Sequence, residues 1–419
     1  MASSPSPSSD GCFHPATIIA STAAATLSLL ALLRLSLYPR HPQTLKSPLH
    51  TVIPSLTPTE VDALEYKPDT FPGARDVETP YGSVRVYEFG PETGQKVLLL
   101  HGISTSCQTL THIAHRLVGT GGGYRVMLFD LFGRGFSDAP SDLSHDARLY
   151  VSQTLIALAS SPLSWTGKDA RVKVVGYSMG GGIATHFVAS FPGMVESLAL
   201  LAPAGMIRPE KFGRLANFVY RSGMVPGRVL GALTRRRLER PIASGVKGGE
   251  GSKKRPGNAE EEMLLGSGSE DNNNNNNNTS TKGPVDAALA EAADDDEGRK
   301  DLEPSTRLEV KVLKYVQWMV RHHAGFIPAF MASLRDAPLM GQHAAYARLA
   351  ATGVPVAVVF GKKDTVVDER GYREDGLEIM GGEDRVMWRV VEGGHDFPMT
   401  NVDAVMEVLE EFWGKTAGA

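Results

Sequence analysis

Short apolar runs separated by helical patterns constrain the fold of this 419-residue chain more than any other feature. Each run is four to seven residues long and is followed by turn residues. Such alternation is typical of βαβ units, in which helices cover both faces of a mostly parallel sheet. We therefore predict an α/β fold. The expected strands are Ser83–Phe89, Lys96–Leu100, Tyr124–Phe129, Val172–Val175, Ser197–Leu201, Val354–Phe360 and Arg385–Val391.

About 150 residues separate the fifth expected strand from the sixth, which indicates an inserted subdomain. Residues 207–240 and 306–335 have helical patterns, and the first stretch carries nine Lys or Arg against two Glu. Residues 244–303, rich in Gly, Asn, Asp and Glu, are predicted to be disordered. We expect a helical lid that contains a disordered insert. The predicted organisation is a tail at 1–45, a core at 46–206, the lid at 207–353 and the rest of the core at 354–419.

The segment Gly176-Tyr177-Ser178-Met179-Gly180 fits the pattern G-x-S-x-G. It directly follows an expected strand and precedes a helical pattern, which is the context of a nucleophile elbow. Glycines allow the sharp turn that exposes a serine hydroxyl at the end of a strand. An ordinary glycine-rich turn is the alternative. We predict that Ser178 is a catalytic nucleophile.

A serine hydroxyl needs a base, and the base needs an acid that orients it. Asp364 and His395 each follow an expected strand, in the turns Gly361–Asp364 and Glu392–His395. Both turns should emerge at the same sheet edge as Ser178, in the chain order Ser, Asp, His of α/β-hydrolases. We predict His395 as the base and Asp364 as the acid, with Asp368 as the rival acid.

A tetrahedral oxyanion needs backbone N–H donors aimed at the developing charge. One predicted donor is Met179, directly after the nucleophile, and the other is Ile103, in the turn after the strand Lys96–Leu100. His101 in the same turn is interpreted as a structural residue.

Residues 15–33 carry no charge, and as a helix they would extend roughly 28 Å, enough to cross a bilayer. We predict a signal anchor or single span, with a mitochondrial transit peptide, a cleaved signal peptide and a surface helix as alternatives. Arg34, Arg40 and Lys46 follow the run, whereas only Asp10 precedes it. The positive-inside rule therefore predicts a cytosolic catalytic domain, with the endoplasmic reticulum preferred over mitochondria.

The balance of charges and the cysteine count exclude several classes of partner. The chain has 43 Lys and Arg against 47 Asp and Glu, so no basic excess favours nucleic acid. Its two cysteines, Cys12 and Cys107, belong to no motif that predicts a disulfide framework or a metal site. We expect neither a bound metal nor a nucleic-acid partner, and the oligomeric state stays open.

Together these motifs resemble the α/β-hydrolase superfamily. The resemblance rests on His101-Gly102, on Asp130–Asp138 (DLFGRGFSD), on the elbow and on the turns that end at Asp364 and His395. The loop Asp130–Asp138 and Pro203–Gly205 are similar to the membrane-anchored monoacylglycerol lipase-like branch and to meta-cleavage-product C–C hydrolases. The resemblance implies a Ser178–His395–Asp364 triad, an acyl-enzyme intermediate and no cofactor. Epoxide hydrolases and dehalogenases are excluded because they need Asp at the elbow.

We therefore expect a membrane-anchored serine hydrolase that cleaves carboxylic esters of apolar acyl chains, such as lipid esters. A small-molecule hydrolase that cleaves a thioester or a C–C bond with the same triad is the first alternative. A non-catalytic, membrane-tethered interaction protein is the second. Aromatic residues of the lid predict either an apolar acyl pocket or simple lid packing: Phe212, Phe218, Tyr220, Trp318, Phe326 and Phe330.

Overall fold

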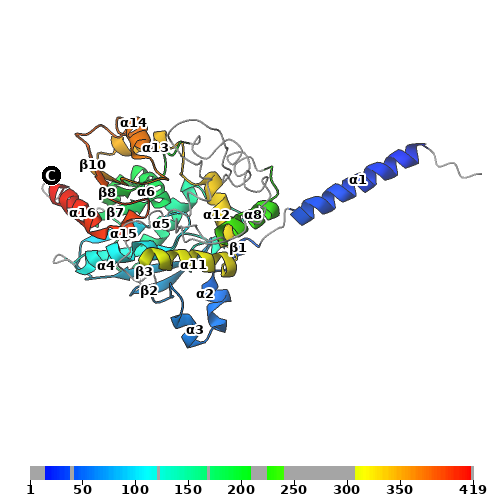
Figure 1. Cartoon of the computed structure of the whole chain (residues 1–419), viewed down its shortest axis with the longest axis horizontal. Coiled ribbons are helices and arrows are strands. Elements are labelled where there is room, and N and C mark those ends of the chain that lie inside the picture. The colour runs from blue at the N-terminus through cyan, green and yellow to red at the C-terminus, as the bar shows by residue number, and fades with distance from the viewer. Residues whose placement is uncertain are drawn as a thin grey trace, which may run out of the picture.

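An eight-stranded sheet forms the centre of the computed structural model (Figure 1). Its strands lie in the order β10-β9-β8-β7-β4-β5-β3-β2. All neighbouring pairs from β10 to β5 are parallel, whereas β3 pairs antiparallel with both β5 and β2. The strands are β2 (Ala74–Thr79), β3 (Gly82–Phe89), β4 (Lys96–Leu100), β5 (Arg125–Phe129), β7 (Val172–Tyr177), β8 (Val195–Leu201), β9 (Val356–Gly361) and β10 (Val386–Val391). The structure describes residues 15–37, 42–119, 123–167, 170–208, 224–239 and 307–416.

The prediction of a mostly parallel sheet is confirmed. Each of the seven expected strands is present, and its ends differ from the predicted ones by two residues or fewer. The sequence analysis missed β2, whose side chains are alternately exposed and half-buried. Alternate side chains of β2 face water, so this strand needs no continuous apolar run.

Helices cover both faces of the sheet. On one face, α4 (Thr111–Gly119) packs on β5, and α16 (Val402–Thr416) packs on β8 and β10. On the other face, α6 (Met179–Ser190) packs on β4, β7 and β8. Helices α5 (Ala147–Ala159) and α13 (His343–Ala351) flank α6. The central strand β7 is buried along its whole length because helices exclude water from both of its faces.

Three helices of the long segment between β8 and β9 contact one another. They are α8 (Gly227–Glu239), α11 (Leu308–His322) and α12 (Phe326–Asp336). The helical pattern of residues 306–335 is thus split into two helices, with His323 in extended backbone at the break. The predicted insert 244–303 lies outside the described residues, as do Phe212, Phe218 and Tyr220.

Helix α1 (Pro15–Leu37) extends away from the body (Figure 1). Its 23 residues make a helix of roughly 35 Å. Within the described part of the chain, it is the one helix long and apolar enough to cross a membrane. Strand β1 (Thr44–Leu45) follows and pairs antiparallel with β6 (Ala139–Pro140). The short helices α2 (Pro48–Thr51) and α3 (Pro58–Asp62) come next, and Thr57 caps α3 through a capping box with Glu60.

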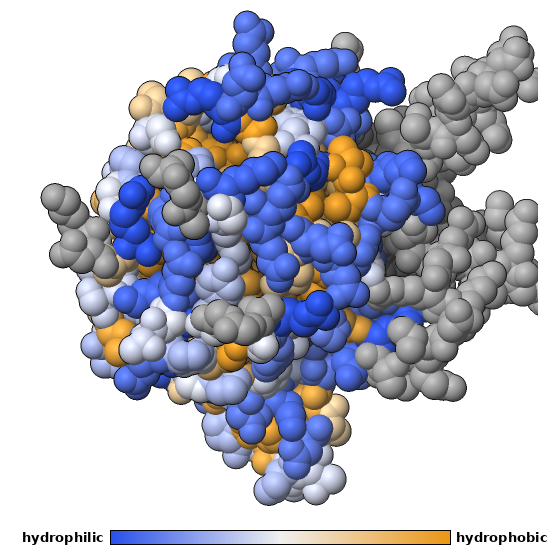
Figure 2. All heavy atoms as spheres, turned by 90° about the vertical axis from the view of Figure 1, so that its left-hand side faces the viewer, coloured by the Kyte–Doolittle hydropathy of each residue, from blue (hydrophilic) through white to orange (hydrophobic). Residues whose placement is uncertain are grey.

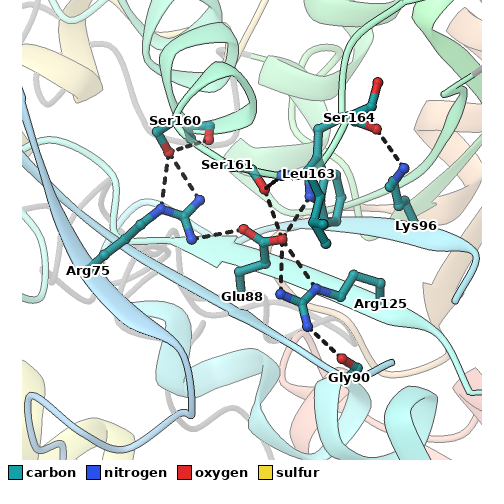
Figure 3. A network of polar contacts seen from close by, with 11 residues as sticks. Arg75, Glu88, Gly90, Lys96, Arg125, Ser160, Ser161, Leu163 and Ser164 are labelled. Atoms are coloured by element: carbon teal, nitrogen blue, oxygen red, sulfur yellow. Dashed lines mark hydrogen bonds and ion pairs between the residues drawn. The ribbon is translucent and has the colours of Figure 1, made fainter. Parts of the chain in front are cut away.

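Glu88 on β3 is a buried carboxylate at the centre of a polar network (Figure 3). It forms ion pairs with Arg75 of β2, at 2.8 Å, and Arg125 of β5, at 3.1 Å. Ser161 Oγ and Trp165 Nε1 donate to Glu88 Oε1. Burial opposes the charged form, but the two hydrogen bonds and the two arginines outweigh it, so the pKa of Glu88 lies below its usual range. The network joins three strands to the segment after α5.

We expect Glu88→Gln to lower the free energy of unfolding by roughly 3 kcal/mol, because it leaves two arginines without their carboxylate partner. Urea denaturation at neutral pH measures the change. The matched control is Glu383→Gln, since Glu383 is exposed and pairs with Arg373 at the surface. That pair should contribute less than about 1 kcal/mol. Equal effects of the two variants would contradict a structural role for the Glu88 network.

Candidate active site

Ser178 lies in the sharp turn between β7 and α6. Its backbone has φ +53°, a conformation that L-residues rarely adopt and that costs roughly 1–3 kcal/mol. Neighbouring chain holds it there: Ser178 N–H donates to Leu201 O at 3.0 Å, and Ser178 O accepts from Ala204 N at 2.8 Å. The turn therefore has the strained geometry of a nucleophile elbow, as the pattern G-x-S-x-G predicted.

Gly180 lets the elbow pack against the end of β4. A Cβ atom at this position would lie 2.3 Å from Leu100 O and 2.7 Å from His101 O. Backbone atoms at such distances cannot give way without moving the loop that contains Ile103. The glycine is thus required by close approach rather than by its own backbone angles.

We expect Gly180→Ala to lower kcat at least about tenfold and to destabilise the fold by roughly 1–3 kcal/mol through overpacking. Gly193→Ala is the matched control, because nothing lies within 4 Å of its added Cβ. Activity assays and thermal unfolding of the two variants measure the effects. A fully active Gly180→Ala enzyme would show that the loop after β4 tolerates displacement.

The structure brings Ser178, His395 and Asp364 together at the carboxyl ends of β7, β10 and β9. Ser178 Oγ lies 3.1 Å from His395 Nε2, and His395 Nδ1 lies 2.7 Å from Asp364 Oδ2. The His395 and Asp364 side chains are 0% and 1% exposed, and Ser178 is 5% exposed. These three residues, separated by up to 217 positions, form one hydrogen-bonded chain.

Further hydrogen bonds, from two backbone N–H groups and from one tyrosine hydroxyl, hold the acid and the base in place. Asp364 Oδ1 accepts from the N–H groups of Val366 and Val367, each at 2.8 Å, which leaves Oδ2 for the imidazole. Tyr177 Oη donates to His395 O at 3.0 Å. The rival acid, Asp368, caps α14 (Glu369–Gly376) and accepts from Gly371 N. The described contacts therefore pair His395 with Asp364 and engage Asp368 in a helix cap.

The two residues predicted as oxyanion donors lie on turns beside Ser178. Met179 begins α6, and Ile103 lies in the loop after β4. Strands β4 and β7 are parallel neighbours, with Leu100 opposite Gly176, so both turns leave the sheet at the same edge. Met179 and Ile103 are almost fully buried. Their N–H groups are thus in a region from which water is largely excluded.

Arg134 is a buried cation that ties the loop of Ile103 to the helices above the sheet. Its Nε donates to Ile103 O at 2.9 Å, and one terminal nitrogen donates to Phe132 O at 2.8 Å and Tyr150 Oη at 2.9 Å. The other donates to Ser333 Oγ of α12 at 2.8 Å. The sequence analysis included Arg134 in a family motif but assigned it no role. The one sequence feature that could have indicated a structural role for Arg134 is its place between two glycines, in the sequence GRG.

His101, Cys107 and Asp130 form a buried group whose possible ligand atoms lie within 4.8 Å of one another. The sequence analysis predicted no metal site and did not foresee this grouping. Its atoms already bind the backbone: Leu131 N donates to His101 Nε2, while Cys107 N and Phe136 N donate to the Asp130 carboxylate. Lone pairs of His101 and Asp130 that could bind an ion therefore accept hydrogen bonds from the backbone of the loop.

We expect the protein to lose stability steeply as the pH falls below about 6.5. Burial and the Arg134 charge lower the pKa of His101 to about 3 and that of His145 to about 4, and burial lowers that of His323 to about 4. The unfolded chain therefore binds three protons that the folded chain does not, each contributing about 1.4 kcal/mol per pH unit. Burial raises the pKa of Asp130 to about 6. Below that pH the folded chain therefore holds one proton that the unfolded chain does not, which offsets one of the three histidine protons.

Urea denaturation between neutral pH and about pH 5 measures this loss, which should approach roughly 3 kcal/mol per pH unit. His145→Gln should reduce the slope, whereas His343→Gln should not, because His343 is exposed. A free energy of unfolding that is constant over this range would contradict neutral buried histidines.

The described lid aromatics differ in their surroundings. Phe326 and Phe330 are fully buried and pack against each other. Trp318 stacks on Tyr315 and lines a surface groove of about 220 Å³ between α11 and residues 63–65. Ser178, Asp364 and His395 do not line this groove. Phe326 and Phe330 therefore pack inside the body, whereas Trp318 is half-buried beside a groove that these three site residues do not line.

The sheet order and the elbow define an α/β-hydrolase fold. Residues 91–396 match the family described as serine aminopeptidase, S33 (Hydrolase_4). This match covers well over half of the chain, so the chain belongs to this family of α/β-hydrolases, as the resemblance predicted.

Curated relatives match only part of the chain. A serine hydrolase-like protein of Danio rerio is 31% identical over 132 residues, which are 31% of this chain and 38% of the relative. Lipase 1 of Psychrobacter immobilis is 34% identical over 125 residues, 30% of this chain and 37% of the relative. The chain thus spans about two fifths of the length of these relatives. The solved structure of a bacterial membrane phospholipase A has the same fold, with a TM-score of 0.53, 16% identity and coverage of 96% of this chain and 99% of that one.

Proposed function

We propose that this protein is a membrane-anchored serine hydrolase that cleaves carboxylic esters of apolar acyl chains. The observation that carries the proposal is the hydrogen-bonded chain from Ser178 Oγ through His395 to Asp364. Membership of a serine hydrolase family supports it, as does the partial similarity to a lipase.

In the proposed reaction, Ser178 Oγ attacks the ester carbonyl while His395 Nε2 takes the hydroxyl proton. Asp364 holds the imidazole with Nδ1–H toward its carboxylate, and the N–H groups of Ile103 and Met179 stabilise the oxyanion. The acyl–oxygen bond breaks, and the alcohol leaves with the proton from His395. Water then adds to the acyl-enzyme by the reverse proton path, which releases the acid and restores Ser178. No metal or cofactor takes part in this scheme.

The lid and the anchor belong to the same proposal. Helices α8, α11 and α12 form the lid within residues 207–353, a range that also contains α13 beside α6, and the core comprises residues 46–206 and 354–419. Helix α1 is proposed as a single membrane span, since it is long, apolar and exposed along its length. The arginine in its last turn, Arg34, supports a cytosolic catalytic domain.

A fluorescent fluorophosphonate tests the nucleophile and the anchor together. We expect labelling of the wild-type protein in the membrane fraction and none of Ser178→Ala. Labelling of both proteins, or of neither, would remove Ser178 from the mechanism and favour a non-catalytic, membrane-tethered protein. Labelling in the soluble fraction would contradict the anchor.

A substrate panel tests the proposed ester class. Esters of increasing acyl length should be cleaved with a kcat/KM that rises with chain length. Amino-acid anilides, thioesters and a C–C bond substrate serve as the comparison, because an acyl-enzyme on serine also permits these reactions. Faster cleavage of any of these would overturn the assignment to esters while leaving the triad intact.

A further inference from the structure

The body of the protein lies close to the end of α1. Helix α1 ends at Leu37, and the chain is paired again from Pro42, whose carbonyl accepts from Ser141 Oγ. Ser141 N–H also donates to Gln43 O at 2.8 Å. Five residue steps join Leu37 to Pro42, and an extended chain of that length covers at most about 18 Å. Whatever the direction of α1, its end is therefore near β1 and β6.

Exposed apolar side chains gather at this end of the body. Outside α1, the described large apolar residues that are exposed are Leu143, Met224, Val229 and Val390. Leu143 follows β6 by three residues. Met224 precedes α8 and Val229 lies in its first turn, and α8 contacts α1 and α12. Figure 1 shows α8, α12 and β1 side by side where α1 leaves the body. Three of the four residues thus belong to elements next to the anchor.

Helix α8 packs its apolar face against the body and exposes a largely basic face. Leu230, Thr234 and Leu238 are buried and form one face at a spacing of four residues. The exposed positions include Val229, Arg228 and Arg235. Basic side chains near an anionic leaflet are attracted to it, and exposed apolar side chains beside them can enter its interface. Arg34 in the last turn of α1 adds positive charge on the same side.

We propose that Leu143, Met224, Arg228, Val229 and Arg235 form an anchor-side surface that docks the catalytic domain on an anionic lipid leaflet. The apolar side chains enter the interface and the arginines bind lipid phosphates. The opposite end of the body, which faces the viewer in Figure 2, is largely hydrophilic and also carries apolar patches. Docking holds α8 of the lid against the leaflet, so a lipid ester reaches the lid directly from the bilayer. This inference rests on the proposed anchor but not on Ser178.

A fluorescent probe on the full-length protein tests the surface. A single cysteine replaces Val229, 43% exposed, or in the matched control Val390, 47% exposed on β10 at the far edge of the sheet. Cys12 is replaced by serine, and Cys107 is buried. Each protein carries the environment-sensitive dye NBD and is reconstituted into phosphatidylcholine vesicles with and without phosphatidylglycerol. Lipids with nitroxide-labelled chains report contact by quenching.

We expect the dye at position 229 to shift to shorter wavelengths and to be quenched in vesicles that contain phosphatidylglycerol. The dye at position 390 should show the emission of a water-exposed dye and no quenching in both lipid mixtures. With Arg228→Glu and Arg235→Glu together, the dye at 229 should lose both its wavelength shift and its quenching, while α1 keeps the protein on the vesicles. A dye at 229 that behaves like the one at 390 would overturn the proposal, and equal signals in the two lipid mixtures would overturn the anionic partner.

Failure of the anchor is distinguishable in the same samples. Protein that does not float with the vesicles would refute the anchor and the docking surface together. Fluorophosphonate labelling of that protein reports independently whether Ser178 is reactive. Flotation tests the anchor, the dye at position 229 tests the docking surface, and fluorophosphonate labelling tests the proposed nucleophile.

Discussion

Replacing Ser178 with alanine is expected to lower the kcat of ester hydrolysis on the order of 10⁶-fold. The Ser178 hydroxyl is the atom that His395 Nε2 faces at 3.1 Å, so the variant has a base and an acid but no nucleophile to activate. Residual hydrolysis should come from water held by substrate binding and the backbone donors, roughly 10³–10⁴-fold above the uncatalysed rate. Single-turnover assays with a chromogenic ester measure the loss.

The fold of the alanine variant should persist, which separates this prediction from simple unfolding. Alanine keeps the Cβ at φ +53°, so the free energy of unfolding should change by no more than about 1 kcal/mol, the value of one lost hydrogen bond. Ser178→Gly should be as inactive but at least as stable as Ser178→Ala, since glycine adopts this φ without strain. Ser197→Ala, a buried serine on β8, is the activity control. An active Ser178→Ala enzyme would refute the mechanism.

The parallel part of the sheet was predictable from sequence because burial on both faces demands continuous apolar runs. The run Lys96–Leu100 and its neighbours are short, apolar and β-branched or leucine-rich, and helices cover them on both sides. The chain Ser178, His395 and Asp364 was predictable for a related reason. All three follow predicted parallel strands, and the carboxyl ends of such strands meet at one edge.

Elements stabilised by polar contacts were not predictable in the same way. The edge strand β2 has no apolar run to mark it, because one of its sides faces water. In the sequence, Glu88 cannot be told apart from an exposed charged residue of a strand. Its burial depends on Arg75, Arg125 and Trp165, which are distant along the chain. Hydrogen bonds between such segments depend on register and on strand order, which periodicity does not encode.

The support of the oxyanion loop was missed for the same reason. Arg134 donates to Ile103 O and to Ser333 Oγ, residues 31 positions before and 199 positions after it. A motif marks Arg134 as part of a loop, but only the packing of α12 onto that loop shows what its guanidinium binds. The sequence therefore predicts the reacting groups better than the groups that hold them.

Asp364→Asn is expected to lower kcat on the order of 10⁴-fold while leaving the geometry of the site intact. Asparagine can keep its carbonyl oxygen on the N–H groups of Val366 and Val367, which then turns its NH₂ group toward His395 Nδ1. That nitrogen must accept a hydrogen bond, so the proton moves to Nε2. A protonated Nε2 cannot take the proton of Ser178, and fluorophosphonate labelling should slow in proportion to kcat.

Asp368→Asn is the matched control, because Asp368 lies four residues along the chain and was the rival acid in the sequence. Asparagine can still accept from Gly371 N and cap α14, so we expect activity within about threefold of wild type and a stability change below about 1 kcal/mol. If Asp368→Asn loses activity and Asp364→Asn retains it, the acid is misassigned. If both variants retain it, His395 acts without a carboxylate partner, although Asp364 Oδ2 lies 2.7 Å from its ring. Because the two residues lie in the same loop between β9 and α14 and Asp364 is hydrogen-bonded to the imidazole, the comparison isolates that hydrogen bond.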